Sequence, residues 1–275
     1  GLLLKNIFLS PELKHVQGSV VAVPAYYTFE QRNDIIDAMW AAELSLYNLI
    51  DDNEAIATLY SIRFAKRFTD EPQSILFVDA GATSIKAYRG VFNMNHTTNP
   101  PTPLVNLTSY EWTESCGGEN FAIKYSKYKQ ISVTKARKQL STLSSLSKSE
   151  LDTIFSEELT SLSHLIKRAS NGPIDHIQIF GGLSRFPIVV DTILNAAGGV
   201  EMRRDLPPND AIALGSQYVL MNLNNISLFQ FPNLTRSSPY NLFVECNGVT
   251  DDYCYKSANC SEATLLENTR CEVFN

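Results

Sequence analysis

The chain has 275 residues, and 44% of them are hydrophobic, which is enough apolar material for a sizeable core in one large or two medium domains. The formal net charge is −6 and no run of Lys or Arg occurs, so the sequence offers no electrostatic footprint for nucleic acid or for an anionic membrane surface. No apolar stretch reaches the roughly 18 to 20 residues of a membrane span, and the N-terminus lacks a signal-peptide pattern, so a secretory form would already have lost its signal.

Strand and helix signals alternate along the first part of the chain, which is typical of an α/β protein. Residues 16–23 (VQGSVVAV), closed by Pro24, predict a buried strand, and residues 29–50 carry the apolar spacing of a helix. Residues 74–79 (SILFVD) predict a second strand, which is continuously apolar, ends at an acidic residue and leads into a turn of small residues. Residues 91–110 contain three prolines and predict an exposed, loop-rich excursion.

The second half repeats this arrangement. Residues 149–168 are amphipathic and predict a helix that ends before Gly172-Pro173. Residues 174–180 (IDHIQIF) predict a strand that runs into Gly181-Gly182, and residues 186–197 continue as a helix.

The composition changes to Asn, Ser, Thr, Pro and Cys from about Asn222, so we expect a domain boundary near Leu223. Short β-like runs such as residues 240–245 follow it. Four of the five cysteines lie in this last part, and we favour two disulfides over a zinc site because no CxxC pair and no nearby histidine supports zinc. Three pairings are open for these residues, Cys246, Cys254, Cys260 and Cys271.

Five Asn-x-Ser/Thr sequons indicate a glycosylated product, more than chance alone would place in a chain of this length. They lie at Asn95, Asn106, Asn225, Asn233 and Asn259. Together with the clustered cysteines they favour an oxidising secretory compartment.

Two glycine-bearing turns are the candidates for binding chemistry. After the strand at 74–79, residues 79–84 (DAGATS) combine a carboxylate, a glycine that lets a phosphate approach, and hydroxyl groups. Residues 181–185 (GGLSR) offer a second cluster of backbone N–H groups and a cation. Alone, the first turn is better explained as a β-turn with an Asp cap, and the second is equally well explained as a tight strand-to-helix connection. Two of them, about a hundred residues apart and each ending a strand, favour a nucleotide clamped between both.

Six segments, in order, resemble those of the seventy-kilodalton heat-shock chaperones, whose ATPase domain has the actin and hexokinase fold. The matching segments are 23–32 (VPAYY followed by Gln31-Arg32), 76–84, 116–121 (CGGENF), 136–141 (ARKQLS), 180–187 (FGGLSRFP) and 208–215 (PNDAIALG). The resemblance therefore predicts an actin-like fold for residues 1–222, with residues 223–275 beginning a β-rich polypeptide-binding domain.

Carried over position by position, the resemblance implies a site for ATP or ADP with Mg²⁺. It implies adenosine contacts at Arg137, Lys138, Ser141 and Arg185, and phosphate contacts at Gly81, Ala82, Gly181 and Gly182. Lys138 and Arg185 would sandwich the base. Asp79 would orient a magnesium-bound water without ligating the metal directly. Ser84 falls where the family has a catalytic-site threonine.

Several residues depart from the family pattern, and these departures affect the expected hydrolysis of ATP more than its binding. Asp52-Asn53 stands where hydrolysing members have a glutamate and a proline, and this form resembles the large endoplasmic-reticulum branch of the family. Lys86 replaces an aspartate near the metal, and Leu183 replaces a serine. The family's first phosphate hairpin and its catalytic lysine have no counterpart in this sequence, so that lobe is expected to be missing. These differences speak against fast hydrolysis and leave ATP binding open.

The resulting hypothesis is an ATP-binding chaperone of the endoplasmic reticulum lumen. It would act as nucleotide-exchange factor for a lumenal seventy-kilodalton chaperone and hold unfolded polypeptides during protein translocation and folding. One alternative is a foldase that hydrolyses ATP to drive client release. Another is a sugar kinase of the same fold, which would need a general-base aspartate that does not stand out in the sequence.

Overall fold

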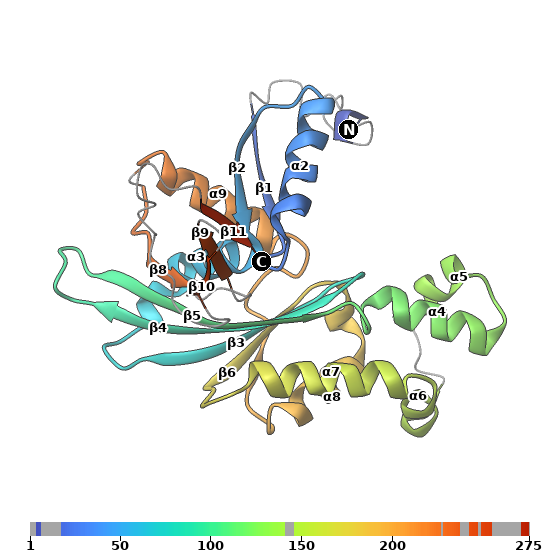
Figure 1. Cartoon of the computed structure of the whole chain (residues 1–275). Coiled ribbons are helices and arrows are strands. Elements are labelled where there is room, and N and C mark those ends of the chain that lie inside the picture. Colours follow the sequence, from blue (N-terminus) through green and yellow to red (C-terminus); the bar gives the residue numbers. More distant parts are fainter. Residues whose placement is uncertain are drawn as a thin grey trace.

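A six-stranded sheet of order β7-β6-β3-β4-β5-β8 runs through the computed structural model of the chain (Figure 1). The structure describes residues 4–6, 18–140, 146–226 and 228–236, and only the backbone of three later strands, 242–246, 249–254 and 271–274. The sheet strands are β3 (Gln73–Ala80), β4 (Ile85–Asn95), β5 (Thr102–Thr113), β6 (His176–Phe180), β7 (Met202–Arg203) and β8 (Asn233–Arg236).

β4 pairs antiparallel with both β3 and β5, whereas β3, β6 and β7 form parallel pairs in that order. On the far edge β8 pairs parallel with β5. An antiparallel hairpin that continues into parallel strands with helical crossovers is consistent with the predicted actin-like fold.

Helices cover both faces of this sheet. One face carries α3 (Asp52–Phe64) with η2 (Ala65–Arg67), and α9 (Ala211–Leu223) packs on α3. The other face carries α7 (Ser156–Ala169) and α8 (Pro187–Ala196). The hydrophobic core on this side is shared by α4 (Gly118–Lys129), α5 (Val133–Gln139), α6 (Lys148–Ile154) and η4 (Gly182–Arg185). Figure 1 shows α7 and α8 below the sheet and α3 and α9 above it.

A small parallel sheet of β1 (Ser19–Val23) and β2 (Leu46–Asp51) stands beside α9, with α2 (Phe29–Ala41) connecting its two strands (Figure 1). Separately, β9 (Leu242–Cys246) pairs antiparallel with β10 (Val249–Cys254) and β11 (Cys271–Phe274). No helix among the described residues is long and apolar enough to span a membrane.

The continuous apolar run in β3 explains its central position. Leu76, Val78 and Ala80 belong to the core shared with α4–α8, whereas Ile75 and Phe77 belong to the core shared with α3 and α9. Successive side chains of a strand point to opposite faces, so a strand buried on both sides needs apolar residues throughout.

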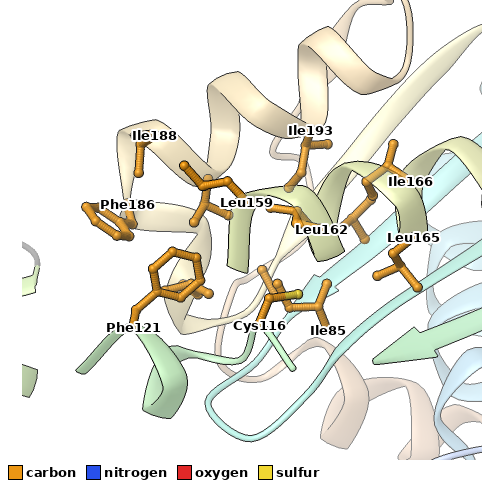
Figure 2. Close-up of a cluster of buried hydrophobic side chains, with 14 of the residues drawn as sticks. Ile85, Cys116, Phe121, Leu159, Leu162, Leu165, Ile166, Phe186, Ile188 and Ile193 are labelled. Atoms are coloured by element: carbon orange, nitrogen blue, oxygen red, sulfur yellow. The ribbon is translucent and has the colours of Figure 1, made fainter. Parts of the chain in front are cut away.

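The first of these cores is built largely by α7. Its leucines and isoleucine (Leu159, Leu162, Leu165, Ile166) face α8 and the sheet in Figure 2, where Cys116 lies among them. The second core is aromatic and surrounds Tyr60, whose ring lies within 6.1 Å, centroid to centroid, of Phe64, Phe68, Phe77 and Phe92. Edge and tilted contacts of this kind add to the stabilisation from burial.

Close approach of α9 to α3 depends on Gly215. A Cβ at this position would lie 2.0 Å from the carbonyl oxygen of Ala55. The two helices can therefore touch backbone to backbone only because this residue has no side chain.

Several predicted elements are confirmed, and others are wrong. Strands β3 and β6 and helix α8 lie where the sequence predicts them. β1 forms but is mostly half-buried. The predicted helix over 29–50 ends at Ala41, because Glu43 adopts a left-handed conformation (φ 59°) and the following residues pair with β1 as β2.

Two further corrections concern the middle of the chain. The segment 91–110 is not an exposed excursion, because its residues form most of the β4–β5 hairpin and the turn is confined to residues 96–101. The predicted helix over 149–168 is two helices, α6 and α7, which meet at the buried Phe155.

Candidate functional site

The two glycine-bearing turns follow neighbouring parallel strands. β3 and β6 pair in parallel, with Asp79 opposite Phe180, so both strands end at the same edge of the sheet. The turn 81–84 continues from β3, and residues 181–185 continue from β6. Ligands of open α/β sheets bind outside the carboxyl ends of such strands. The predicted meeting of the two turns is therefore present in the structure.

Gly181 has a conformation that requires glycine. Its φ is +86°, and a Cβ there would lie 2.5 Å from the carbonyl oxygen of Ala80. Its N–H donates to the carbonyl of Pro208 (3.0 Å), and its carbonyl accepts from the hydroxyl of Ser184 (2.7 Å). The missing side chain lets the turn after β6 lie directly against the end of β3, and the two hydrogen bonds fix the turn itself and its place beside Pro208.

The first turn of α4 fixes the other corner. Gly118 N donates to the carbonyl of Gly81 (3.1 Å), and Glu119 N donates to the carbonyl of Ala82 (2.8 Å). Gly81 N in turn donates to the carbonyl of Ser84 (3.1 Å). Two N–H groups at the start of α4 therefore position the β3–β4 turn.

A cavity of ≈ 620 Å³ lies between these corners, α4 and α5. Phe186, in its wall, packs edge to face on Phe121 of α4, with ring centroids 5.6 Å apart (Figure 2). The volume falls in the range of small-molecule sites. The cavity is lined by Gly81, Ala82, Thr83, Gly118, Glu119, Arg137, Leu140, Gly182, Leu183, Arg185 and Phe186.

Two arginines border this cavity from different elements, Arg137 from α5 and Arg185 from η4. Arg137 makes a bidentate pair with Glu119, both N–O distances being 2.7 Å, and this hydrogen bonding lowers the pKa of Glu119. Lys138 is exposed and does not line the cavity, so Arg137 is the α5 cation at its wall. The proposed adenosine contact of Lys138 stays a prediction, and Ser141 lies outside the described residues.

A smaller cavity of ≈ 280 Å³ adjoins the larger one. Its wall contains Asp79 from β3, Gly181 after β6, and the Pro208-Asn209 pair that precedes α9. Gly182 lines both cavities, and no atom lies within 4 Å of the point where a Cβ would stand on it. Of the predicted phosphate residues, Gly81 and Ala82 line the larger cavity, Gly181 lines the smaller one, and only Gly182 lies at the junction.

The predicted catalytic pair lies deeper. Ser84 is buried and its side chain hydrogen-bonds Tyr26. Asp79 is also buried, and its Oδ2 lies 2.7 Å from Lys86 Nζ. The same ammonium donates to Asp52 Oδ2 at 2.9 Å.

The Lys86 contacts bear on the predicted magnesium-bound water. Asp79, which would orient that water, already faces the ammonium group of Lys86. The carboxylate of Asp52 contacts the same ammonium group. Among the described residues no group of three or more His, Cys, Asp or Glu could hold a metal ion. Asp52 and Asp79 therefore do not fit a divalent cation bound between them.

Several cavity residues were given no role by sequence reasoning. These residues are Gly118, Glu119, Pro208 and Asn209. All four lie within segments that resemble the chaperone family, and this resemblance could have marked them as part of the site. The pairing of Lys86 with Asp52 joins residues 34 positions apart, and no sequence pattern predicted it.

The predicted disulfides cannot be placed, because Cys260 and the side chains of Cys246, Cys254 and Cys271 lie outside the described residues. Cys116 is a free, buried thiol in the first core.

The sequence relationships agree with this geometry. Residues 5–103 match the model of the Hsp70 protein family. It is 22% identical to hypoxia up-regulated protein 1 of Danio rerio, over 74% of this chain and 26% of that protein. It is 24% identical to heat shock 70 kDa protein 17 of Arabidopsis thaliana, over 85% of this chain and 33% of that protein.

The 97 kDa heat shock protein of Strongylocentrotus purpuratus is 23% identical, over 86% of this chain and 31% of that protein. These relatives are members of the Hsp70 superfamily, and the chain spans only about a quarter to a third of their length.

Proposed function

We propose that this domain binds an adenine nucleotide in the two joined cavities. The observation that carries the proposal is the convergence of the β3 and β6 turns on one space, which also has Arg137 and Arg185 in its wall. The adenosine would occupy the larger cavity, where two guanidinium groups and Phe186 suit a flat, aromatic ring. The phosphates would extend toward the smaller cavity past Gly182, which has open space where a side chain would stand.

In the complete protein this nucleotide would regulate a chaperone. An Hsp70-family domain generally implies nucleotide binding with Mg²⁺, and the relatives' names mark heat-shock and hypoxia-induced proteins. The Asp52-Asn53 pair, which resembles the large endoplasmic-reticulum branch, supports a nucleotide-exchange factor acting on a lumenal seventy-kilodalton chaperone and on unfolded polypeptides. The β-rich polypeptide-binding domain, predicted from residue 223, would then begin after β8, which is still a strand of the large sheet.

The proposed lumenal location draws on the sequons. Asn225 and Asn233 are exposed, as glycosylation requires, whereas Asn95 and Asn106 are half-buried in the β4–β5 hairpin. Asn259 lies outside the described residues. Expression through a secretory pathway followed by glycosidase treatment tests this part: a mobility shift that becomes smaller in the Asn225→Gln, Asn233→Gln double variant is expected. Absence of any glycan would remove the sequon argument for the lumen.

Calorimetric titration of the purified protein with ATP and ADP tests nucleotide binding. The matched variant is Gly182→Val, whose branched side chain would project into open space at the junction of the cavities. We expect binding by the parent protein, loss of binding in Gly182→Val, and closely similar melting temperatures for the two. Titration heats that are absent from the parent protein, or unchanged by the valine, would contradict the proposed site.

A separate experiment addresses exchange activity. The release of labelled ADP from a lumenal seventy-kilodalton chaperone is followed with and without this protein, using Gly182→Val as the comparison. Faster release is expected with the parent protein. No acceleration at saturating protein would remove the exchange role and leave nucleotide binding to be decided by the titration.

A further inference from the structure

Lys86 forms a buried charge bridge between two elements of the site. Its ammonium lies 2.9 Å from Asp52, the first residue of α3, and 2.7 Å from Asp79 on β3. All three residues are less than 9% exposed. Lys86 comes from β4, the neighbour of β3, so α3, β3 and β4 meet at this one cation.

The other polar groups around Asp52 complete its coordination. Asp52 Oδ1 accepts from the N–H groups of Ala25 (3.2 Å) and Asn53 (2.8 Å), and the hydroxyl of Tyr110 lies 3.2 and 3.3 Å from its two oxygens. Both carboxylate oxygens therefore already have donors. A buried carboxylate with this many partners has no lone pair directed at an additional ligand.

The charge state of the bridge is also fixed by its surroundings. Burial disfavours the ammonium form, but the charges of Asp52 and Asp79 more than offset this and raise the pKa of Lys86 above its usual value. Lys86 thus remains a cation at physiological pH. It stands where the chaperone family has an aspartate, so one anion of the usual site is exchanged for a fixed positive charge.

This cation is next to the smaller cavity. Asp79 lines that cavity and is in direct contact with Lys86. A carboxylate at this point would repel phosphate groups unless a cation neutralised it, and in a magnesium-dependent site the metal supplies that charge. Here a side chain of the protein supplies it.

We propose that Lys86 is a built-in counter-ion of the nucleotide site, and that this site takes its nucleotide without needing a divalent cation at Asp52 and Asp79. The inference rests on the proposed nucleotide binding and deepens it. Any magnesium carried by the nucleotide would be held by its own phosphates and by water. Because Lys86 engages the carboxylates of Asp52 and Asp79, the bound nucleotide would stabilise one conformation of the domain.

The test compares nucleotide affinity in Mg²⁺ and in EDTA by calorimetric titration. For the parent protein we expect the dissociation constants of ADP and ATP to differ by less than about threefold between the two conditions, well short of the tenfold that corresponds to about 1.4 kcal/mol. Lys86→Asp restores the residue type of the family, and Lys86→Arg keeps the positive charge. Affinity should become magnesium-dependent in Lys86→Asp and remain independent in Lys86→Arg.

A second measurement needs no nucleotide. The melting temperature of the parent protein should be unaffected by millimolar Mg²⁺, whereas that of Lys86→Asp should rise, because three adjacent carboxylates would then lack a counter-ion. Tenfold or greater weakening of the parent's binding in EDTA, or a magnesium-induced rise of its melting temperature, would overturn the counter-ion role while leaving nucleotide binding in place. No binding in either condition would remove the proposed function and this inference with it.

Discussion

Tyr60 of α3 and His176 of β6 are joined by a hydrogen bond of 3.0 Å between Tyr60 Oη and His176 Nε2 in the aromatic core. The ring of Tyr60 is fully enclosed, and His176 is 3% exposed. The contact ties the helix that begins at Asp52 to the strand that ends at the Gly181 turn. Two parts of the candidate site are thereby held together through the core beneath them.

The stability of the protein should depend on the protonation of His176. Burial, reinforced by the charge of Arg203, lowers the pKa of His176 to about 4, although Glu201, Asp205 and Asp175 act in the opposite direction. The unfolded chain takes up this proton near pH 6.5, so acidification from there toward pH 4 favours the unfolded state by up to about 3 kcal/mol. Above pH 6.5 both states are neutral and the effect is absent.

Urea unfolding at neutral pH and near pH 5 measures this effect in the parent protein and in His176→Gln, which keeps a polar partner for Tyr60. We expect the variant to lose less free energy of unfolding on acidification than the parent. Equal losses in the two proteins would show that other groups account for the acid sensitivity.

Substitution of Gly215 by alanine should destabilise the protein although alanine favours helix. The new methyl group would meet the carbonyl of Ala55 at 2.0 Å, so α9 must move away from α3, at a cost of about 1–3 kcal/mol. Thermal unfolding compared with Gln217→Ala, an exposed position of the same helix, measures this cost. A Gly215→Ala protein as stable as the parent would mean that the helices are not in contact here.

Nucleotide affinity should distinguish Arg185 from Lys138. Arg185 lines the larger cavity, so Arg185→Ala should weaken ADP binding by about 0.5–2 kcal/mol, the range of cation–π contacts. Lys138 lies outside the cavity wall, and Lys138→Ala should leave the affinity close to that of the parent. Similar weakening by both substitutions would instead support the sandwich of Lys138 and Arg185 predicted from the sequence.

Cys116 should be inert toward thiol reagents in the folded protein. Burial, with a contribution from the charge of Glu158, raises the pKa of its thiol to about 12, so almost no thiolate exists at neutral pH. Mass spectrometry of the peptide that contains Cys116 should show alkylation only after unfolding. Modification at the same rate in native and denaturing buffer would indicate that the α7 core opens readily.

The sequence predicted the parts of the fold that depend on local pattern. β3 and β6 are continuous apolar runs between turn residues, and such runs are typical of strands buried on both faces. The positions of the two glycine-bearing turns could be predicted because each turn comes directly after one of these strands. The ends of parallel neighbours meet at one edge, so the shared cavity could be expected once both strands were placed.

The errors arose where distant contacts decide the structure. β2 is a strand because β1 is available to pair with it, and that partner lies more than 20 residues away in the sequence. In the β4–β5 hairpin the prolines at 100 and 101 mark only the turn, whereas the long pairing on both sides outweighs their local signal. The Lys86 bridge depends on three elements meeting, which residue spacing does not reveal.

The short strand β8 lies along the outer edge of the hairpin, where Asn233–Arg236 pair with residues 104–107 of the 12-residue strand β5 (Figure 1). Arg236 fastens it through ion pairs to Asp51 (2.6 Å) and Glu54 (2.9 Å). An uncovered strand edge invites strands of other molecules to add to it. These few residues beyond α9 therefore cover part of the edge of the largest sheet, and their removal would leave the backbone groups of residues 104–107 open to pairing with a strand of another molecule.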